Sequence, residues 1–293
     1  MEHLRTNMEV SERRACQVTS QPRMTQRYRT KQPDKDKALT AEIKKLAKKY
    51  KRYGYRMITA KLHQEGWNVN HKCVQRIWQK EGLQVPYRRK FEKARGSSEN
   101  SCCVKKAEHI NHVWTYDFMS DQTEDGRRLK LLTVLDEFTR ESLTIEVGRS
   151  IKSKDVLQVL EYLFAVRCVP GFIRSDNGPE FIADAIKQWL KKEHVGTLYI
   201  EPGSPWENGY IESFNGKLRD EILKREVFYS VKEAKVIVES WRLEYNNHRP
   251  HSSLGYMTPA AFAASCNPAG SAALRLSDCR TRNMDNSLIE CGT

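Results

Sequence analysis

Apolar residues recur at helical spacing through the first third of the chain. Leu39, Ile43 and Leu46 fall on one face of a predicted helix, and lysines occupy most of the other positions. The same spacing predicts two further helices, and Asn70 stands directly before the last of them, where its side chain can cap the helix. The three predicted helices span residues 36–50, 57–66 and 71–80. This region is therefore expected to be all-α, with the order of a helix-turn-helix domain.

After residue 112 the pattern changes to short runs of β-branched and aromatic residues bounded by turn residues, which predict strands. The predicted strands span residues 113–119, 129–135, 142–147, 172–175 and 197–200. Helical spacing predicts helices over 153–167 and 181–193, one that carries Glu212, and a last one from a Ser230–Glu233 capping box to Tyr245. Two hairpins followed by alternating helices and strands predict an α/β fold with a mixed five-stranded sheet and flanking helices.

Three segments lack a long periodic pattern. Residues 1–35 are polar with two short helical patterns, so they form either a small helix-turn-helix or a disordered basic arm. Residues 86–111 are basic and then rich in small polar residues, which is typical of a linker, and residues 266–293 are expected to be a disordered tail. A helical domain over 36–85 and a core domain over 112–265 complete the predicted organisation.

The positive charge of the chain lies entirely in its first part. Residues 1–112 hold 27 Lys and Arg against 11 Asp and Glu, whereas residues 113–293 hold 23 against 26. A folded basic region beside a nearly neutral one predicts a polyanion-binding half, and nucleic acid is the polyanion it fits best.

Membrane spans, signal peptides and cysteine patterns indicate the cellular compartment of a protein. No stretch reaches the roughly 18 apolar residues of a membrane span, and the start of the chain lacks the apolar run of a signal peptide, so a cytoplasmic location is expected. The eight cysteines form neither a disulfide framework nor a Cys-x-x-Cys zinc pattern. Reduced thiols are therefore expected.

Three carboxylates stand where the predicted core can bring them to one site. Asp117 interrupts an aromatic-rich strand, where a charged residue is costly unless it faces a site. Asp176 ends a predicted strand, and Glu212 lies on the polar face of a helix with 35 residues between them. Any one of these acids by itself is better explained as a solvated charge. Together they suit two Mg²⁺ or Mn²⁺ ions, which hold the attacking and leaving oxygens of a phosphoryl transfer.

Several motifs resemble a known superfamily. The run Ser175–Phe181 (Ser-Asp-Asn-Gly-Pro-Glu-Phe) and the 35-residue gap before Glu212 resemble the DDE transposase and retroviral integrase superfamily. More narrowly, the runs Glu207–Glu221 and Tyr245–Pro259 resemble the second-reading-frame transposase of the bacterial insertion-sequence-three family. The resemblance extends from about Val10 to Ala264.

The resemblance implies a ribonuclease-H-like integrase catalytic core behind a helix-turn-helix DNA-binding region. It implies a transposase that cleaves DNA and transfers strands, with Asp117, Asp176 and Glu212 as catalytic residues that bind two Mg²⁺ or Mn²⁺ ions per active site. The implied partners are the terminal inverted repeats of the element, target DNA, the first-reading-frame protein of the same element and further copies of this chain, with no membrane.

Six further residues are expected to contact DNA. Arg219 follows Glu212 by seven residues, almost two helical turns, so both side chains project from one face of the helix. Its guanidinium can therefore bind a phosphate beside the metal ions. Asn215 lies one turn from Glu212 and joins the same face. The outer side of the predicted helix 71–80 carries side chains suited to a major groove, namely Lys72, Gln75, Arg76 and Gln79.

Other residues near the site have weaker claims. Trp206 and Tyr210 either stack on an unpaired DNA base or pack within the protein. Asp136, Glu180 and Glu207 are expected to lie outside the group of metal ligands, and Asp136 is expected to cap the turn after its strand.

Two other functions fit parts of this pattern. A ribonuclease-H-like nuclease without strand transfer would use the same carboxylates, but it needs no basic helix-turn-helix ahead of the core. A catalytically inactive DNA-binding regulator would need that region, but it would not need all three carboxylates.

Overall fold

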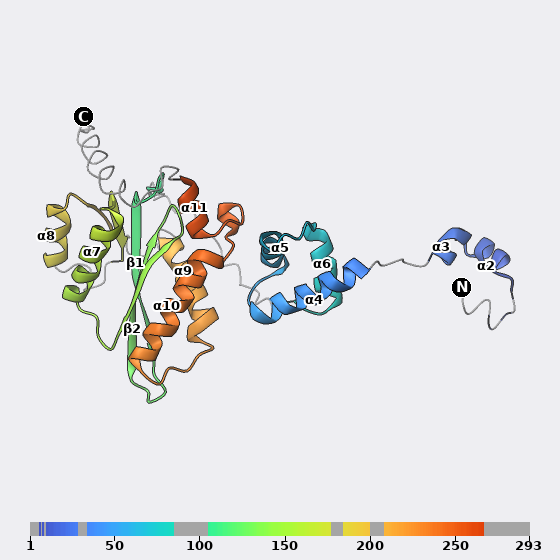
Figure 1. Ribbon diagram of the computed structural model, residues 1–293, viewed down its shortest axis with the longest axis horizontal. Helices are drawn as coiled ribbons and strands as arrows, with labels where there is room; N and C mark the ends of the chain where they lie inside the picture. The colour runs from blue at the N-terminus through green and yellow to red at the C-terminus, as the bar shows by residue number, and fades with distance from the viewer. Residues whose placement is uncertain are drawn as a thin grey trace, which may run out of the picture. The chain divides into compact units, whose positions relative to one another are not determined.

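In this computed structural model the chain packs as two units, one of residues 1–58 with 68–85 and one of 59–67 with 86–293 (Figure 1). The structure describes residues 6, 8, 10–28, 34–84, 105–176, 184–199 and 208–266, with only the backbone for 34–36. Most of the predicted linker, the predicted tail beyond residue 266 and the positions of Glu180, Trp206 and Glu207 lie outside these residues.

Two short helices form where the N-terminal segment predicted them. Helix α2 (Glu12–Val18) begins after Ser11, whose side chain accepts a hydrogen bond from the Arg14 backbone. Helix α3 (Arg23–Arg27) returns to it, and Arg27 Nε lies 2.8 Å from Glu12 Oε1. The segment therefore has helical order over both predicted stretches.

Three longer helices follow: α4 (Asp34–Lys49), α5 (Tyr55–Gln64) and α6 (His71–Lys80). Asn70 caps α6 as predicted, because its side-chain oxygen accepts a hydrogen bond of 2.9 Å from the Lys72 backbone. Lys44 of α4 lies 2.6 Å from Glu81, just after α6. The helices bury apolar residues at helical spacing, namely Leu39, Ile43, Leu46, Ile58, Leu62, Val74, Ile77 and Trp78.

The second unit contains the predicted mixed sheet. Its strands are β1 (Val113–Gln122), β2 (Arg128–Asp136), β3 (Ser142–Gly148), β4 (Phe172–Ser175) and β5 (Gly196–Tyr199). Their order is β3-β2-β1-β4-β5, with β1–β2 and β2–β3 antiparallel and β1–β4 and β4–β5 parallel. Strand β1 runs three residues beyond its predicted end, because Ser120 to Gln122 pair with the start of β2.

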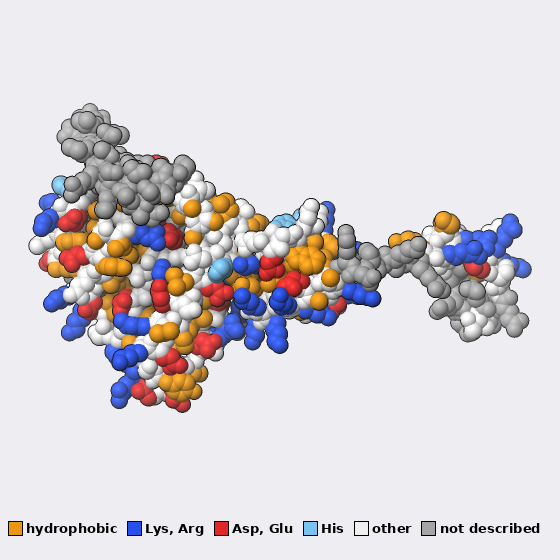
Figure 2. Space-filling model, in the orientation of Figure 1, with side chains coloured by type: hydrophobic (Ala, Val, Ile, Leu, Met, Phe, Trp, Pro, Cys, Tyr) orange, Lys and Arg blue, Asp and Glu red, His pale blue; other side chains and the backbone are white. Residues whose placement is uncertain are grey.

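Helices cover both faces of the sheet (Figure 1). Helices α7 (Ser153–Arg167) and α8 (Asp184–Lys192) lie on one face, and α9 (Gly209–Leu218) and α10 (Val231–His248) lie on the other. Trp114 and Tyr116 pack in the first layer, whereas Met119 packs with Phe214 and Trp241 in the second. A π-helical turn η2 (Arg219–Leu223), a short helix η3 (Ser252–Leu254) and α11 (Pro259–Cys266) complete this unit. In Figure 2, acidic and basic side chains are interspersed over its visible surface.

A bulge lets β3 contribute to both layers. Val134 pairs with Thr144 and Leu135 with Ser142, so Leu143 is an extra residue in the ladder. Leu143 packs on the α7 side of the sheet, whereas Ile145 packs on the α10 side.

Two expectations need correction. The Ser230 side chain accepts a hydrogen bond from the Glu233 backbone, as a capping box requires. The Glu233 carboxylate, however, accepts a hydrogen bond from the Tyr229 backbone and not from that of Ser230, so the box is incomplete. Helix α10 also continues for three residues beyond its predicted end at Tyr245. Cys168 is disulfide-bonded, so the expectation of reduced thiols is wrong for this residue.

Among the described residues, no helix combines the length and the apolar character that crossing a membrane requires.

Candidate active site

Asp117 sits in the middle of β1, on the sheet face that α9 and α10 cover. Its carboxylate accepts hydrogen bonds from the Phe118 backbone at 2.7 Å and from Asn215 Nδ2 at 2.8 Å. The pKa of Asp117 is raised from 3.8 to about 6. Burial is the largest cause, the charges of Asp176 and Glu212 act in the same direction, and the two hydrogen bonds oppose them. The carboxylates of Asp176 and Glu212 therefore both lie within electrostatic reach of Asp117.

Asp176 directly follows β4 and is exposed. Strand β4 runs parallel to β1 with Arg174 opposite Thr115. Extending this register by two residues brings Asp176 beside Asp117 on the same face, because side chains alternate along a strand. Sheet geometry thus explains why a strand end and a strand interior supply neighbouring carboxylates.

Two asparagines attach α9 to the sheet. Asn208, just before the helix, accepts a hydrogen bond of 2.9 Å from the Thr115 hydroxyl, and Asn215 accepts one of 3.0 Å from the Thr133 hydroxyl. The two asparagines are seven residues apart, which is two helical turns, so they lie on one side of α9. Glu212 lies between them on the same side, which directs this exposed carboxylate along the edge of the helix that meets β1.

Asn215 is predicted from sequence to contact DNA, but its surroundings give it another role. The residue is only 8% exposed, and its amide bonds both Asp117 and Thr133. An amide held at both ends has little freedom to reach a phosphate. Asn215 therefore orients the Asp117 carboxylate, and its spacing of one turn from Glu212 was the only sequence signal for this position.

The other predicted DNA contacts are accessible. Arg219 is exposed where α9 passes into η2, and among the described residues its side chain makes no hydrogen bond or ion pair. On α6, Lys72, Arg76 and Gln79 are exposed and Gln75 is half-buried. The α6 residues belong to the helical part of the chain and Arg219 to the sheet-containing unit.

A buried ion pair fixes the strand that leads to Asp176. Arg174 Nη1 donates to both oxygens of Glu137, at 2.8 and 2.9 Å, and the two side chains are 4% and 1% exposed. Arg174 Nη2 also donates to the Lys105 carbonyl at 2.6 Å. Sequence analysis did not find this pair, because its members are 37 residues apart.

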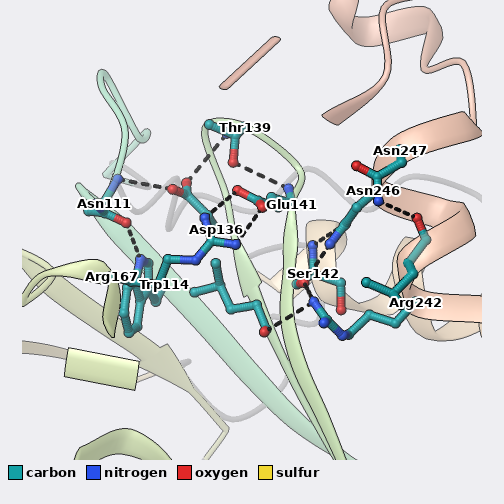
Figure 3. Close-up of polar contacts among 12 residues, drawn as sticks. Asn111, Trp114, Asp136, Thr139, Glu141, Ser142, Arg167, Arg242, Asn246 and Asn247 are labelled. Atoms are coloured by element: carbon teal, nitrogen blue, oxygen red, sulfur yellow. Dashed lines mark hydrogen bonds and ion pairs between the residues drawn. The ribbon is translucent and has the colours of Figure 1, made fainter. Parts of the chain in front are cut away.

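The turn between β2 and β3 is held from several sides (Figure 3). Asp136 accepts hydrogen bonds from the backbones of Phe138 and Asn111, which confirms that it caps this turn. Asn246 of α10 both donates to and accepts from the backbone of Ser142, each at 2.9 Å. Part of the C-terminal motif thus anchors the start of β3.

The carboxylates are chemically suited to divalent cations. Among the described residues, no group of three His, Cys, Asp or Glu side chains converges closely enough to hold one ion. Asp176 and Glu212 nevertheless both raise the pKa of Asp117 through their charge, in addition to the larger effect of burial. Hard carboxylate oxygens around such a charge fit Mg²⁺ or Mn²⁺.

The sequence matches two kinds of known family. Residues 33–91 match the family described as HTH-like domain, and residues 107–205 and 193–259 match families described as Integrase core domain. The Integrase core domain matches agree with the mixed sheet and its flanking helices and confirm the predicted integrase catalytic core.

Relatives from insertion elements cover most of the chain. A protein of element IS407 from Burkholderia multivorans is 38% identical over 264 residues, which is 90% of this chain and 94% of the relative. A protein of element IS476 from Xanthomonas euvesicatoria is 39% identical over 87% of this chain and 73% of the relative. The putative transposase InsK of element IS150 from Escherichia coli is 27% identical over 82% of this chain and 89% of the relative. The chain therefore belongs to the insertion-sequence transposases that join an HTH-like domain to an integrase core domain, the architecture of the insertion-sequence-three family.

Proposed function

We propose that this transposase cleaves DNA and transfers strands with Asp117, Asp176 and Glu212 as the ligands of two Mg²⁺ or Mn²⁺ ions. The observation that carries the proposal is the parallel register of β1 and β4, which sets Asp176 beside Asp117, together with the hydrogen bond from Asn215 that attaches the Glu212 helix to Asp117. When bound, the ions would polarise the scissile phosphate and lower the pKa of a bound water.

The protein's own groups prepare this site before any ion binds. Asn215 and the Phe118 backbone fix the two oxygens of Asp117. The Arg174–Glu137 pair holds the strand that presents Asp176, and Asn208 holds the start of the helix that presents Glu212. Supporting contacts of this kind keep ligands in a productive orientation.

Metal binding is expected to depend on pH through Asp117. Its folded-state pKa is raised from 3.8 to about 6, so the carboxyl is protonated below about pH 6 and charged above it. Without metal, this raised pKa makes the folded state lose stability as pH rises from about 4 to about 6. Added Mg²⁺ should therefore raise the Tm at pH 7, and this increase should disappear as pH falls through about 6.

Melting curves with Mg²⁺ or chelator across this pH range would check the expectation. Asp117→Asn should show no Mg²⁺-induced rise at any pH. A rise of equal size at pH 5 and pH 7 would contradict the assignment of Asp117 as a ligand.

For DNA recognition, we assign base contacts to the outer face of α6. Val74, Ile77 and Trp78 are buried, which turns the opposite side of the helix, with Arg76, to solvent. Arg76→Ala is expected to reduce discrimination between the terminal repeat and random DNA by about 1–3 kcal/mol. Competition binding by the full chain would measure this discrimination, with Lys48→Ala on the exposed side of α4 as the control. Equal effects of the two changes would contradict the assignment of base contacts to α6.

Arg219 is assigned to a phosphate of the DNA end. It continues the Glu212 side of α9 and has no described partner that would occupy it. Arg219→Ala is expected to leave the Tm unchanged and to weaken binding of the DNA end by about 1–3 kcal/mol. Arg225→Ala, six residues further on and also exposed, is the matched control. Wild-type binding and joining by Arg219→Ala would assign this residue to the solvated surface.

The proposed partners are the terminal inverted repeats, target DNA, further copies of this chain and the first-reading-frame protein of the same element. The proposed domains are an N-terminal arm over 1–35, a DNA-binding domain over 36–85, a linker, a catalytic core over 112–265 and a tail. The concentration of basic charge before residue 113 supports a DNA-binding region that is separate from the catalytic core.

A strand-transfer assay with radiolabelled element ends tests the function as a whole. Joined products with Mg²⁺ or Mn²⁺ support the transposase chemistry proposed here. Cleavage without joining would favour a nuclease, and end binding without cleavage would favour a regulator. Activity that persists in chelator would end the two-metal proposal.

A further inference from the structure

Three cations act electrostatically on a buried histidine that follows α10. They are Arg140 in the β2–β3 turn, Lys217 on α9 and Arg249 directly after α10. The pKa of His251 is lowered to about 3, chiefly by burial and in addition by the charges of Lys217, Arg249 and Arg140. The cluster of Arg140, Lys217, Arg249 and His251 thus combines residues from three separate parts of the chain.

The carboxylates nearby do not balance this charge. Glu221 is the acid that acts on Lys217, but its two oxygens already bond Arg249 and the Trp241 indole. Glu137 acts on Arg140, but Arg174 occupies both of its oxygens. Positive charge therefore exceeds negative charge in the cluster.

Lys217 is the cation that this imbalance leaves unpaired. Among the described residues its ammonium has no hydrogen-bond or ion-pair partner, although the side chain is half-buried. A half-buried ammonium normally has a partner, because burial without one is costly. Burial and the charge of Arg249 accordingly lower the pKa of Lys217 to about 8.

His251 gives a second, independent sign of a missing group. The residue is 6% exposed, and its Nε2 is a buried polar atom without a hydrogen-bond partner in the part of the chain that the structure describes. Buried polar atoms are nearly always bonded, so an unbonded one calls for an explanation such as an absent ligand. Next to three cations, the fitting ligand is an anion.

The cluster faces a different direction from the metal ligands. Lys217 follows Glu212 by five residues, so the two side chains lie about 140° apart around α9. Tyr210 precedes Lys217 by seven residues and shares its side, where it is 37% exposed. The Arg140 guanidinium lies 3.6 Å from the centre of the Tyr210 ring, so this partly exposed residue borders the cluster.

We propose that the cluster of Arg140, Lys217, Arg249 and His251 binds a phosphodiester group of DNA as a contact separate from the metal site. A phosphate has two free oxygens that can accept hydrogen bonds from an ammonium and a guanidinium at once. That the anion belongs to DNA rests on the proposed function. The site would hold a DNA strand on the side of α9 away from Glu212.

Binding of a short labelled duplex of random sequence in chelator tests the contact, with the full chain throughout. Lys217→Gln is expected to bind about tenfold more weakly than wild type. Its slope of log affinity against log salt should be smaller by roughly 0.9, the value for one lost phosphate contact. Lys232→Gln, which removes the same charge from an exposed position of α10, should match the wild type in both respects.

Acetylation of individual lysines supplies a local measurement. A duplex should slow the modification of Lys217 at least fivefold and leave that of Lys232 unchanged. If Lys217→Gln melts below the wild type, Arg140→Gln replaces it in the binding assay with the same expectation.

Two results would overturn the site. One is equal affinity and slope for Lys217→Gln and Lys232→Gln. The other is slow Lys217 acetylation that a duplex does not change, because a carboxylate of the chain itself would then already fill the cluster. Wild-type protein that binds DNA but joins no ends would instead contradict the proposed function. The binding and acetylation measurements would still test the phosphate contact in that case.

Discussion

Asp117→Asn, Asp176→Asn and Glu212→Gln are each expected to lower DNA cleavage and joining by at least about a thousandfold, which corresponds to about 4 kcal/mol in the activation barrier. Each amide keeps the size of the side chain but removes a negatively charged metal ligand. Binding of the DNA end should persist, because the assigned DNA contacts lie on other residues. The measurements are strand transfer and end binding on the same preparations.

Glu226→Gln is a suitable control, since it removes an exposed acid a few residues after η2. It should leave joining unchanged. Measurable strand transfer by any of the three amide variants would remove that residue from the triad. Loss of DNA binding together with a lower Tm would show instead that the residue holds the fold.

Removing Arg174 is expected to cost about 3–5 kcal/mol of unfolding free energy, because it leaves the Glu137 carboxylate buried without its partner. Arg174→Met approximates the length of the side chain and removes its charge. Denaturant unfolding would measure the loss. Since β4 leads directly into Asp176, joining should fall as well, even under conditions where the variant stays folded.

The exposed pair of Lys235 and Glu146 provides the matched control, and Lys235→Met should cost at most about 1 kcal/mol. The double variant Arg174→Met with Glu137→Leu should recover much of the stability, because no charge then remains buried. A small loss for Arg174→Met alone would mean that water reaches the Glu137 carboxylate.

Elements with local signals were predicted closely. Helix α6 has its predicted bounds, because Asn70 supplies a cap and the apolar spacing continues to Trp78. Strand β4 also matches, since the polar Asp176 ends a short apolar run. Strand β1 was predicted too short, because its last residues are polar and are held only by pairing with β2.

The supporting contacts of the site lay beyond sequence analysis for a related reason. Asn215 and Thr133 are 82 residues apart, and no local pattern links an amide on a helix to a hydroxyl on a strand. In the sequence, nothing distinguishes Arg174 from an ordinary polar residue of a strand. Only the structure shows its bidentate contact with Glu137. The three carboxylates were found because their spacing follows a motif. Their catalytic role remains a prediction.

The two asparagines that attach α9 have a chemical weakness. Asn208 and Asn215 are each followed by glycine, the sequence in which the next backbone nitrogen most readily attacks the side-chain amide and releases ammonia. Deamidation at Asn215 would replace the donor to Asp117 with a like charge. A Cβ added at Gly209 or Gly216 would meet nothing within 4 Å, so alanine at these positions fits the fold. Alanine after either asparagine is therefore expected to slow deamidation at that position and to leave the attachment of α9 to the sheet unchanged.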